Sequence, residues 1–334
     1  RNTGLDTVFR EAGKDDRNRV VLGDEGTWRY VLDEIESPSL EGNLLGDPAT
    51  RPMWVCLPPS YDQSPTKRYP VVYVLHGFTG DHHTFKSGRL LKLNIGKQAA
   101  ELVGSGEIEE MVFVLVDATS GFAGSMFASN AVAGDYLAYV ALDIVGHVDS
   151  NYRTLAAREH RSIAGHSMGA NGAFDLAIAY PEVFGAIAAM GPSADFAVAP
   201  TYLDEFFQKN PDKLDEPTIV RSAEGRQALL PPQSKGNVDV NLLYAYAAAL
   251  TPNPEKPPYY VELPVRYPGA EIVPEVWDRW LDQDLFSKIE HVGVKLKATT
   301  FFVEIGVGPT TLRLDCHESG GVGAGLEAAG VAFS

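Results

Sequence analysis

Four continuous apolar runs constrain the fold of this chain more than any other feature of its sequence. They cover residues 69–77, 110–119, 161–167 and 184–192, and the first reads YPVVYVLHG. A strand with apolar side chains on both of its faces is typical of a parallel sheet that helices cover on each side. The runs therefore predict the buried strands of a parallel sheet.

Segments of helical character lie between and after these runs. Apolar residues recur at helical spacing over 90–103 and 135–155, a third segment over 169–181 stops at a proline, and a shorter piece covers 274–289. Strands that alternate with helices predict βαβ units. We expect an α/β fold with a mostly parallel, doubly wound sheet, and a further buried strand at 298–306.

The start of the chain is different in composition. Residues 27–35 and 51–59 are rich in aromatic and β-branched side chains and are bounded by glycine and proline. Such segments are typical of strands. They predict a β-rich segment within residues 1–60.

Proline divides the second half of the chain. Twelve of the 22 prolines fall between Pro200 and Pro274, where no clean alternation of strand and helix survives. We interpret 198–283 as a proline-rich cap or insertion. The core is then expected to comprise 1–197 and 284–334.

The charge balance excludes several classes of partner. Lys and Arg number 28 against 44 Asp and Glu, for a net charge of −16, so nucleic acid and anionic membranes are poor partners. No apolar run approaches the ~20 residues that span a bilayer. We expect a soluble protein, either cytoplasmic or secreted. Two distant cysteines, Cys56 and Cys316, argue against a zinc site or a disulfide framework, and we expect no metal and no cofactor.

A glycine-flanked serine is the strongest candidate for chemistry. Residues 165–169, Gly-His-Ser-Met-Gly, fit the G-x-S-x-G pattern of a nucleophile elbow. The elbow turns a strand sharply into a helix, so its neighbours must be small, as Ala164, Gly165, Gly169 and Ala170 are. The alternative is an ordinary Gly-Ser turn. The buried run before Ser167 and the helical segment after it favour the catalytic interpretation.

A nucleophilic serine needs donors for the oxyanion that forms on its substrate. One is expected from the backbone N–H of Met168, and the second from the loop after an earlier strand. The segment 74–85 lies in that position, and the N–H of Phe78 is the predicted donor. We therefore expect an oxyanion hole made by Phe78 and Met168.

Histidines flank both parts of this predicted site. His76 is interpreted as structural, and His166 as a packing residue that the elbow points away from the serine. His82 and His83 are also structural unless they line the mouth of the site. The last two are adjacent and point apart in an extended segment, so they form no metal pair.

Three segments resemble one family. Residues 37–80, 135–154 and 165–192 are similar to the esterase D-type "putative esterase" branch of α/β-hydrolases. That branch includes S-formylglutathione hydrolases, feruloyl and other carboxylic ester hydrolases, siderophore esterases and mycolyltransferases. The resemblance covers 27–197 well and 284–334 loosely. It implies an α/β-hydrolase fold and a Ser-His-Asp triad.

The resemblance implies an order for the triad: serine, then an acid after the seventh strand, then a histidine after the eighth. Ser167 is the implied nucleophile. The chain departs from the family where the acid is expected, and Asp315 is the nearest carboxylate downstream of 298–306. His317 is the candidate base, because only His291 and His317 lie beyond the elbow.

The histidine that serves as base in this family usually follows the last strand, and this sequence has no histidine there. Residues 330–334 (GVAFS) resemble the last strand of the family, and the histidine that should follow it has no counterpart before the chain ends at Ser334. A serine hydroxyl is a weak nucleophile without a base. The alternatives are a truncated chain, a base supplied by His317, or a form without a competent triad.

Three functions remain open from the sequence. The first is a serine carboxylic ester hydrolase with an acyl-enzyme on Ser167 and a small-molecule ester as substrate. The second is an acyltransferase on the same scaffold, and the third is a catalytically impaired, hydrolase-like binding protein. An exposed edge strand makes a homodimer possible. Aromatic residues of the cap are candidates for the pocket, and we expect only two or three near the serine: Tyr202, Phe206, Phe207, Tyr244, Tyr246, Tyr259, Tyr260, Trp277 and Trp280.

Overall fold

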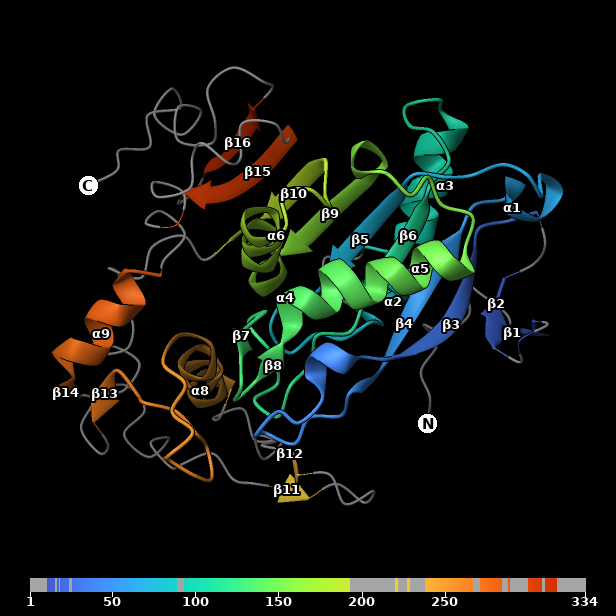
Figure 1. The fold of residues 1–334 in the computed structure, drawn as a ribbon. Helices are drawn as coiled ribbons and strands as arrows, with labels where there is room; N and C mark the ends of the chain where they lie inside the picture. The colour runs from blue at the N-terminus through green and yellow to red at the C-terminus, as the bar shows by residue number, and fades with distance from the viewer. Residues whose placement is uncertain are drawn as a thin grey trace, which may run out of the picture.

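The structure is a computed structural model of the 334-residue chain (Figure 1). It describes residues 11–15, 17, 19–23, 26–88, 93–192, 220–221, 227–228, 238–266, 271–283, 288, 300–307 and 310–316. His291, His317, Tyr202, Phe206 and Phe207 lie outside this part of the chain. So does the segment 330–334.

The strands form one large sheet and three small two-stranded ladders. Their bounds are β1 (Glu11–Lys14), β2 (Val20–Leu22), β3 (Arg29–Glu36), β4 (Thr50–Leu57), β5 (Val71–Leu75), β6 (Val112–Val116), β7 (Ser129–Asn130), β8 (Gly134–Asp135), β9 (Arg161–His166), β10 (Ala186–Met190), β11 (Val220–Arg221), β12 (Gln227–Ala228), β13 (Val265–Arg266), β14 (Glu271–Ile272), β15 (Thr300–Val307) and β16 (Thr310–Cys316). The large sheet has the order β1-β2-β3-β4-β6-β5-β9-β10-β15-β16.

The centre of this sheet is parallel. The pairs β6–β5, β5–β9, β9–β10 and β10–β15 run parallel, whereas the pairs toward both edges run antiparallel. All four apolar runs became central strands, because only a strand covered on both faces gains from apolar side chains on both sides. The predicted α/β class with a mostly parallel core is confirmed.

Helices cover both faces of the sheet. They are α1 (Ser60–Gln63), α2 (Thr84–Ser87), α3 (Ile95–Gly104), α4 (Tyr136–Ala138), the π-helical η2 (Tyr139–Ile144), α5 (Val145–Asn151), α6 (Met168–Ala179), α8 (Val238–Leu250) and α9 (Pro274–Leu281), with 3-10 turns η1 (Pro38–Leu40) and η3 (Arg158–His160). Figure 1 shows α4, α5 and α6 in front of the sheet. None of the helices in the described part of the chain combines the length and apolar character that a bilayer crossing requires.

The strand β5 shows how the two layers are built. Tyr73 and Leu75 belong to the larger hydrophobic cluster, which also contains residues of α5, α6, α8 and α9. Val74, between them, belongs to a second cluster together with Phe85 of α2 and Ala99 of α3. Successive side chains of a strand point to opposite faces, so one strand contributes to two cores. The helices α8 and α9 of the predicted cap pack into the same cluster as the sheet.

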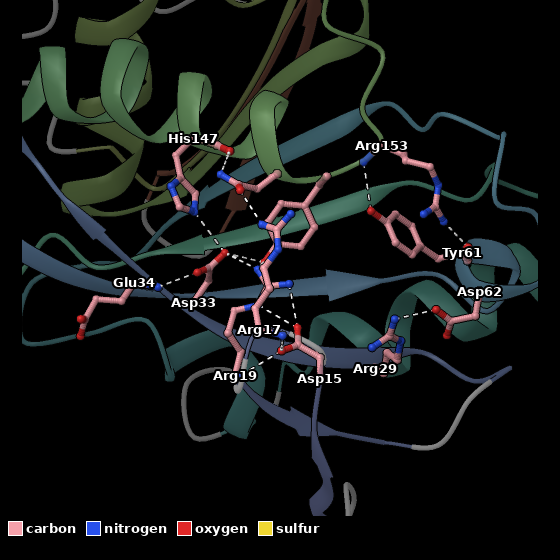
Figure 2. A network of polar contacts seen from close by, with 12 residues as sticks. Asp15, Arg17, Arg19, Arg29, Asp33, Glu34, Tyr61, Asp62, His147 and Arg153 are labelled. Carbon is pink, nitrogen blue, oxygen red and sulfur yellow. Dashed lines mark hydrogen bonds and ion pairs between the residues drawn. The ribbon is translucent and has the colours of Figure 1, made fainter.

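A network of hydrogen bonds and ion pairs connects the N-terminal strands to α5 (Figure 2). Asp33 of β3 accepts hydrogen bonds from Arg19 (2.7 Å), from the Tyr152 hydroxyl (2.7 Å) and from His147 of α5 (3.1 Å). Burial opposes the charge, but hydrogen bonds from His147 and Tyr152 hold the pKa of Asp33 well below its ordinary value. An ionised carboxylate thus joins the antiparallel edge to the helical layer.

Candidate active site

Ser167 occupies a strained turn between β9 and α6. Its backbone dihedrals are φ 54° and ψ −116°, and residues other than glycine rarely adopt a positive φ. Its amide donates to the carbonyl oxygen of Met190 at the end of β10 (2.9 Å), which holds the turn against the sheet. The side chain makes no capping bond to α6 and is only partly buried, so its hydroxyl is accessible.

Two glycines make this turn possible. A Cβ atom on Gly165 would lie 2.0 Å from the carbonyl oxygen of Gly169, and one on Gly169 would lie 2.3 Å from the carbonyl oxygen of Leu75. No side chain fits at these distances. The small residues at these two positions therefore have a direct steric cause: strand, helix and the neighbouring β5 touch through their backbones.

An open pocket of about 300 Å³ reaches Ser167. Its walls come from the turn itself and from the loop that follows β5. The lining residues are Gly77, Phe78, Thr79, Gly80, Asp81, His83, Thr84, Ser87, His166 and Ser167. Ser167 therefore lies in a cleft and not inside packed protein.

The side chains of Phe78 and Met168 both lie close to Gly124. A Cβ atom on Gly124 would lie 2.7 Å from the Phe78 ring and 2.9 Å from the Met168 sulfur. Within the described residues, the backbone amides of Phe78 and Met168 have no hydrogen-bond acceptor. The structure thus brings Ser167 together with two residues whose N–H groups are uncommitted.

His76 holds the loop after β5 in place through both ring nitrogens. Its Nε2 accepts from the amide of Ala118 (2.9 Å), so Nδ1 carries the proton and donates to the carbonyl oxygen of Gly77 (2.8 Å). Burial lowers the pKa of His76. A neutral, buried ring thus ties the loop before Phe78 to the end of β6, which is a structural role.

The rings of His82 and His83 do not point apart as expected, because the turn before α2 brings their centroids to 4.0 Å, but the two have different partners. His82 contacts the buried carboxylate of Asp117 through Nδ1 (2.8 Å) and is not among the residues that line the pocket. His83 does line the pocket, and its Nδ1 accepts from the indole N–H of Trp54 (3.0 Å). Of this pair, only His83 lies at the mouth of the site.

His166 also lines the pocket, although its sequence position suggested a packing residue that points away from the serine. Its Nδ1 is buried and has no hydrogen-bond partner among the described residues. Burial lowers the pKa of His166. Its ring contributes to the wall beside Gly77, where a Cβ would lie 3.2 Å from His166 Nδ1.

Asp315 lies in β16, which returns antiparallel along β15. Its backbone pairs with Phe302, which in turn pairs with Ala188 of β10, and Ala188 pairs with Ala164 of β9. Asp315 is therefore level with a residue three positions before Ser167. The proposed partner of Asp315, His317, is beyond the described residues, so the roles of both stay predictions.

The described aromatic residues of the predicted cap are not part of the pocket lining. Tyr244 packs against Phe122 and Tyr259, with ring centroids 5.7 and 5.1 Å apart, and Trp277 stacks on Trp280 at 5.8 Å. These rings belong to, or pack against, the larger hydrophobic cluster. They form core rather than the wall around Ser167.

Sequence reasoning missed Gly124, Trp54 and Asp117. Asp117 had one signal, since it follows the buried strand β6 at the carboxyl edge of the sheet, where functional side chains gather. Gly124 and Trp54 had none, because their roles depend on contacts with Phe78 and His83 in other segments.

A second pocket, of about 260 Å³, lies at the ends of β4 and β6. Arg51, Asp47, Asp117 and Thr119 are among its lining residues. Arg51 and Asp117 are buried and paired at 3.4 Å. Burial raises the pKa of Asp47 to about 6, and its Oδ2 has no partner among the described residues.

Comparison with known proteins identifies one matching family model. The model described as "Putative esterase" matches residues 48–316, which is most of the chain. A curated protein of Bacillus subtilis (strain 168), YjcH, is 30% identical over 149 residues, covering 42% of this chain and 55% of YjcH. The chain thus spans about half the length of this curated relative.

Solved structures with a similar arrangement include a ferulic acid esterase and a serine hydrolase. The ferulic acid esterase is 19% identical, with a TM-score of 0.46 over 84% of this chain and 90% of that one. The fluorophosphonate-binding serine hydrolase FphF of Staphylococcus aureus is 20% identical, with a TM-score of 0.40 over 52% of this chain and 61% of that one.

Proposed function

The chain belongs to the "Putative esterase" family of α/β-hydrolases, and on this premise we propose that it is a serine carboxylic ester hydrolase that acts through an acyl-enzyme on Ser167. The observation that supports this most strongly is the position of Ser167 at a positive-φ turn in an open pocket. A structural serine in an ordinary turn needs neither the strain nor the cleft.

The first half of the proposed reaction forms the acyl-enzyme. The Ser167 oxygen attacks the ester carbonyl carbon while a base takes its proton. The negative charge that develops on the carbonyl oxygen accepts hydrogen bonds from the amides of Phe78 and Met168, which have no other acceptor among the described residues. The tetrahedral intermediate collapses, and the departing alkoxide takes the proton from the base.

The second half regenerates the enzyme. Water attacks the acyl carbon and gives a proton to the same base, a second oxyanion forms in the same place, and Ser167 leaves with that proton as the acid is released. An alcohol that replaces water gives acyl transfer. Asp315 and His317 are the candidates for acid and base, on the sequence alone.

Labelling with a fluorophosphonate probe and hydrolysis of 4-nitrophenyl acetate test the proposal together. We expect the native chain to be labelled rapidly, and Ser167→Ala to lose the label and at least about 10⁵-fold in kcat. The control Ser150→Ala changes an exposed serine of α5 and should match the native chain. A native chain that neither labels nor hydrolyses esters contradicts the proposal and favours a binding protein.

Two further arms of the same assay separate the remaining alternatives. His317→Ala should lower the labelling rate by about 10³-fold or more if His317 is the base, and an unchanged rate excludes it. Adding butanol and measuring butyl ester against free acid distinguishes an acyltransferase from a hydrolase.

A further inference from the structure

His83 is the ionisable ring on the pocket wall whose protonation state the structure settles. Its Nδ1 lies 3.0 Å from the indole nitrogen of Trp54. An indole N–H only donates, so Nδ1 must be the acceptor and carries no proton. Trp54 is 3% exposed, and a buried N–H without a partner is costly, so this bond persists. In the neutral ring the proton therefore resides on Nε2.

The surroundings keep His83 neutral. Protonation would place a hydrogen on Nδ1 against the Trp54 N–H. Burial is the main cause that lowers the pKa of His83. The His82 ring, whose centroid lies 4.0 Å from that of His83, is the second cause. Lys86, whose ammonium lies 4.6 Å from the Trp54 ring centroid, acts in the same direction, whereas Asp81 and Asp117 oppose it.

This state excludes one role for His83 and permits another. A general base needs a free lone pair, but the Nδ1 lone pair is engaged by Trp54 and Nε2 holds the proton. His83 is therefore not the base that activates Ser167. It is a fixed donor instead, and no described residue accepts from its Nε2.

The pocket wall around this donor is polar. Asp81, Thr84 and Ser87 line it beside His83, while Phe78 is the aromatic residue of the lining. Asp81 Oδ1 already accepts from the His83 amide (2.8 Å), and Thr84 Oγ1 accepts from the Asp81 amide (3.0 Å). The nearby carboxylate and the net charge of −16 disfavour an anionic ligand. An uncharged oxygen acceptor fits a neutral N–H best.

We propose that His83 determines specificity in the Ser167 pocket, donating from Nε2 to an uncharged oxygen (an ether, hydroxyl or carbonyl) that the ester carries outside its reacting group. This inference rests on the proposed esterase function. A substrate that lacks such an oxygen leaves the donor unpaired in a partly desolvated wall, which lowers its transition-state binding.

Two esters of matched shape test this proposal. 4-Nitrophenyl methoxyacetate and 4-nitrophenyl butyrate differ by an ether oxygen in place of a methylene, so we compare the ratio of their kcat/KM values between variants. The intrinsic reactivity of the two esters then cancels. His83→Phe removes the donor and should lower the ratio about tenfold, the equivalent of one hydrogen bond. His83→Gln keeps an N–H near Nε2 and should retain the ratio within about threefold.

The outcomes separate this proposal from the proposed function. If His83→Phe lowered kcat/KM by the same factor for both esters, the role of His83 would be purely structural and the inference would be overturned. The ¹⁵N resonances of His83, measured in the native chain, should show a protonated Nε2 and an unprotonated Nδ1, and the opposite tautomer also overturns it. A third outcome is a native chain that shows the expected tautomer and yet fails both to react with the fluorophosphonate probe and to hydrolyse esters. In that case the proposed function fails, and the specificity role fails with it.

Discussion

At the residue scale, neighbouring residues fix the backbone conformation of Ser167 and the tautomers of two histidines. The sheet holds Ser167 at positive φ through the carbonyl oxygen of Met190. Ala118 selects the Nδ1–H tautomer of His76, and Trp54 selects the Nε2–H tautomer of His83. Two histidines seven positions apart in one loop thus have opposite tautomers, and of the two only His83 is among the residues that line the pocket.

The strain at Ser167 leads to a prediction about stability. In most settings alanine is more stabilising than glycine, but a Cβ atom at positive φ costs about 1–2 kcal/mol. Ser167→Gly should therefore have a larger free energy of unfolding than Ser167→Ala, by about 1 kcal/mol. Urea denaturation of the two inactive variants measures this difference. An alanine variant as stable as the glycine variant would mean that the turn is relaxed.

At the element scale, the site is the junction of β9, α6 and β5. The carbonyl oxygens of Gly169 and Leu75 approach so closely that Gly165 and Gly169 carry no side chain. The helix expected over 135–155 is not a single α-helix, because the π-helical η2 lies between α4 and α5. The close approach of the backbones of β9, α6 and β5 therefore leaves no room for side chains on either side of the elbow.

A pair of glycine substitutions tests this junction. Gly165→Ala places a methyl 2.0 Å from a backbone oxygen, and we expect it to lower the free energy of unfolding by at least about 3 kcal/mol. Gly146→Ala, in the exposed face of α5 with nothing within 4 Å of the new Cβ, should instead raise it by about 0.5–1 kcal/mol. The midpoints and m-values of urea unfolding give both free energies. Similar midpoints for the two variants would contradict the packing of β9 on α6.

At the scale of the whole molecule, two carboxylates whose pKa values are shifted in opposite directions contribute to the dependence of stability on pH. Asp33 stays ionised because Arg19, His147 and Tyr152 surround it (Figure 2). Asp47 lies in the second pocket and has its pKa raised by burial to about 6, despite Arg51 nearby. The folded chain therefore holds the Asp47 proton more tightly than the unfolded chain does.

This raised pKa gives a pH-dependent prediction. Because the ordinary value is 3.8, ionisation of Asp47 destabilises the fold as pH rises from about 4 to 6, by about 1–3 kcal/mol in total. Asp47→Asn does not ionise, so its melting temperature relative to the native chain should be higher at pH 8 than at pH 4.5. The exposed Asp278→Asn of α9 is the control and should show no such trend. A constant difference for Asp47→Asn across this range would contradict the prediction.

The sequence by itself determined the central strands, the α/β class and the position of the elbow. These features have local causes: apolar side chains on both faces require two covering layers, and a sharp strand-to-helix turn requires small neighbours. Residues 69–77 and 161–167 became β5 and β9, with Ser167 directly after the second. The elbow pattern and the position of segment 74–85 predicted the pairing of Phe78 with Met168, and the family resemblance implied the order of the triad.

Only the tertiary structure decided which groups meet around that serine. It brought Gly124 between Phe78 and Met168, joined Trp54 to His83 and His82 to Asp117, and returned β16 antiparallel so that Asp315 lies beside Phe302. The two histidine contacts join residues 29 and 35 positions apart. No local pattern encodes such a contact, because the hydrogen bond exists only after the sheet has aligned the ends of separate strands.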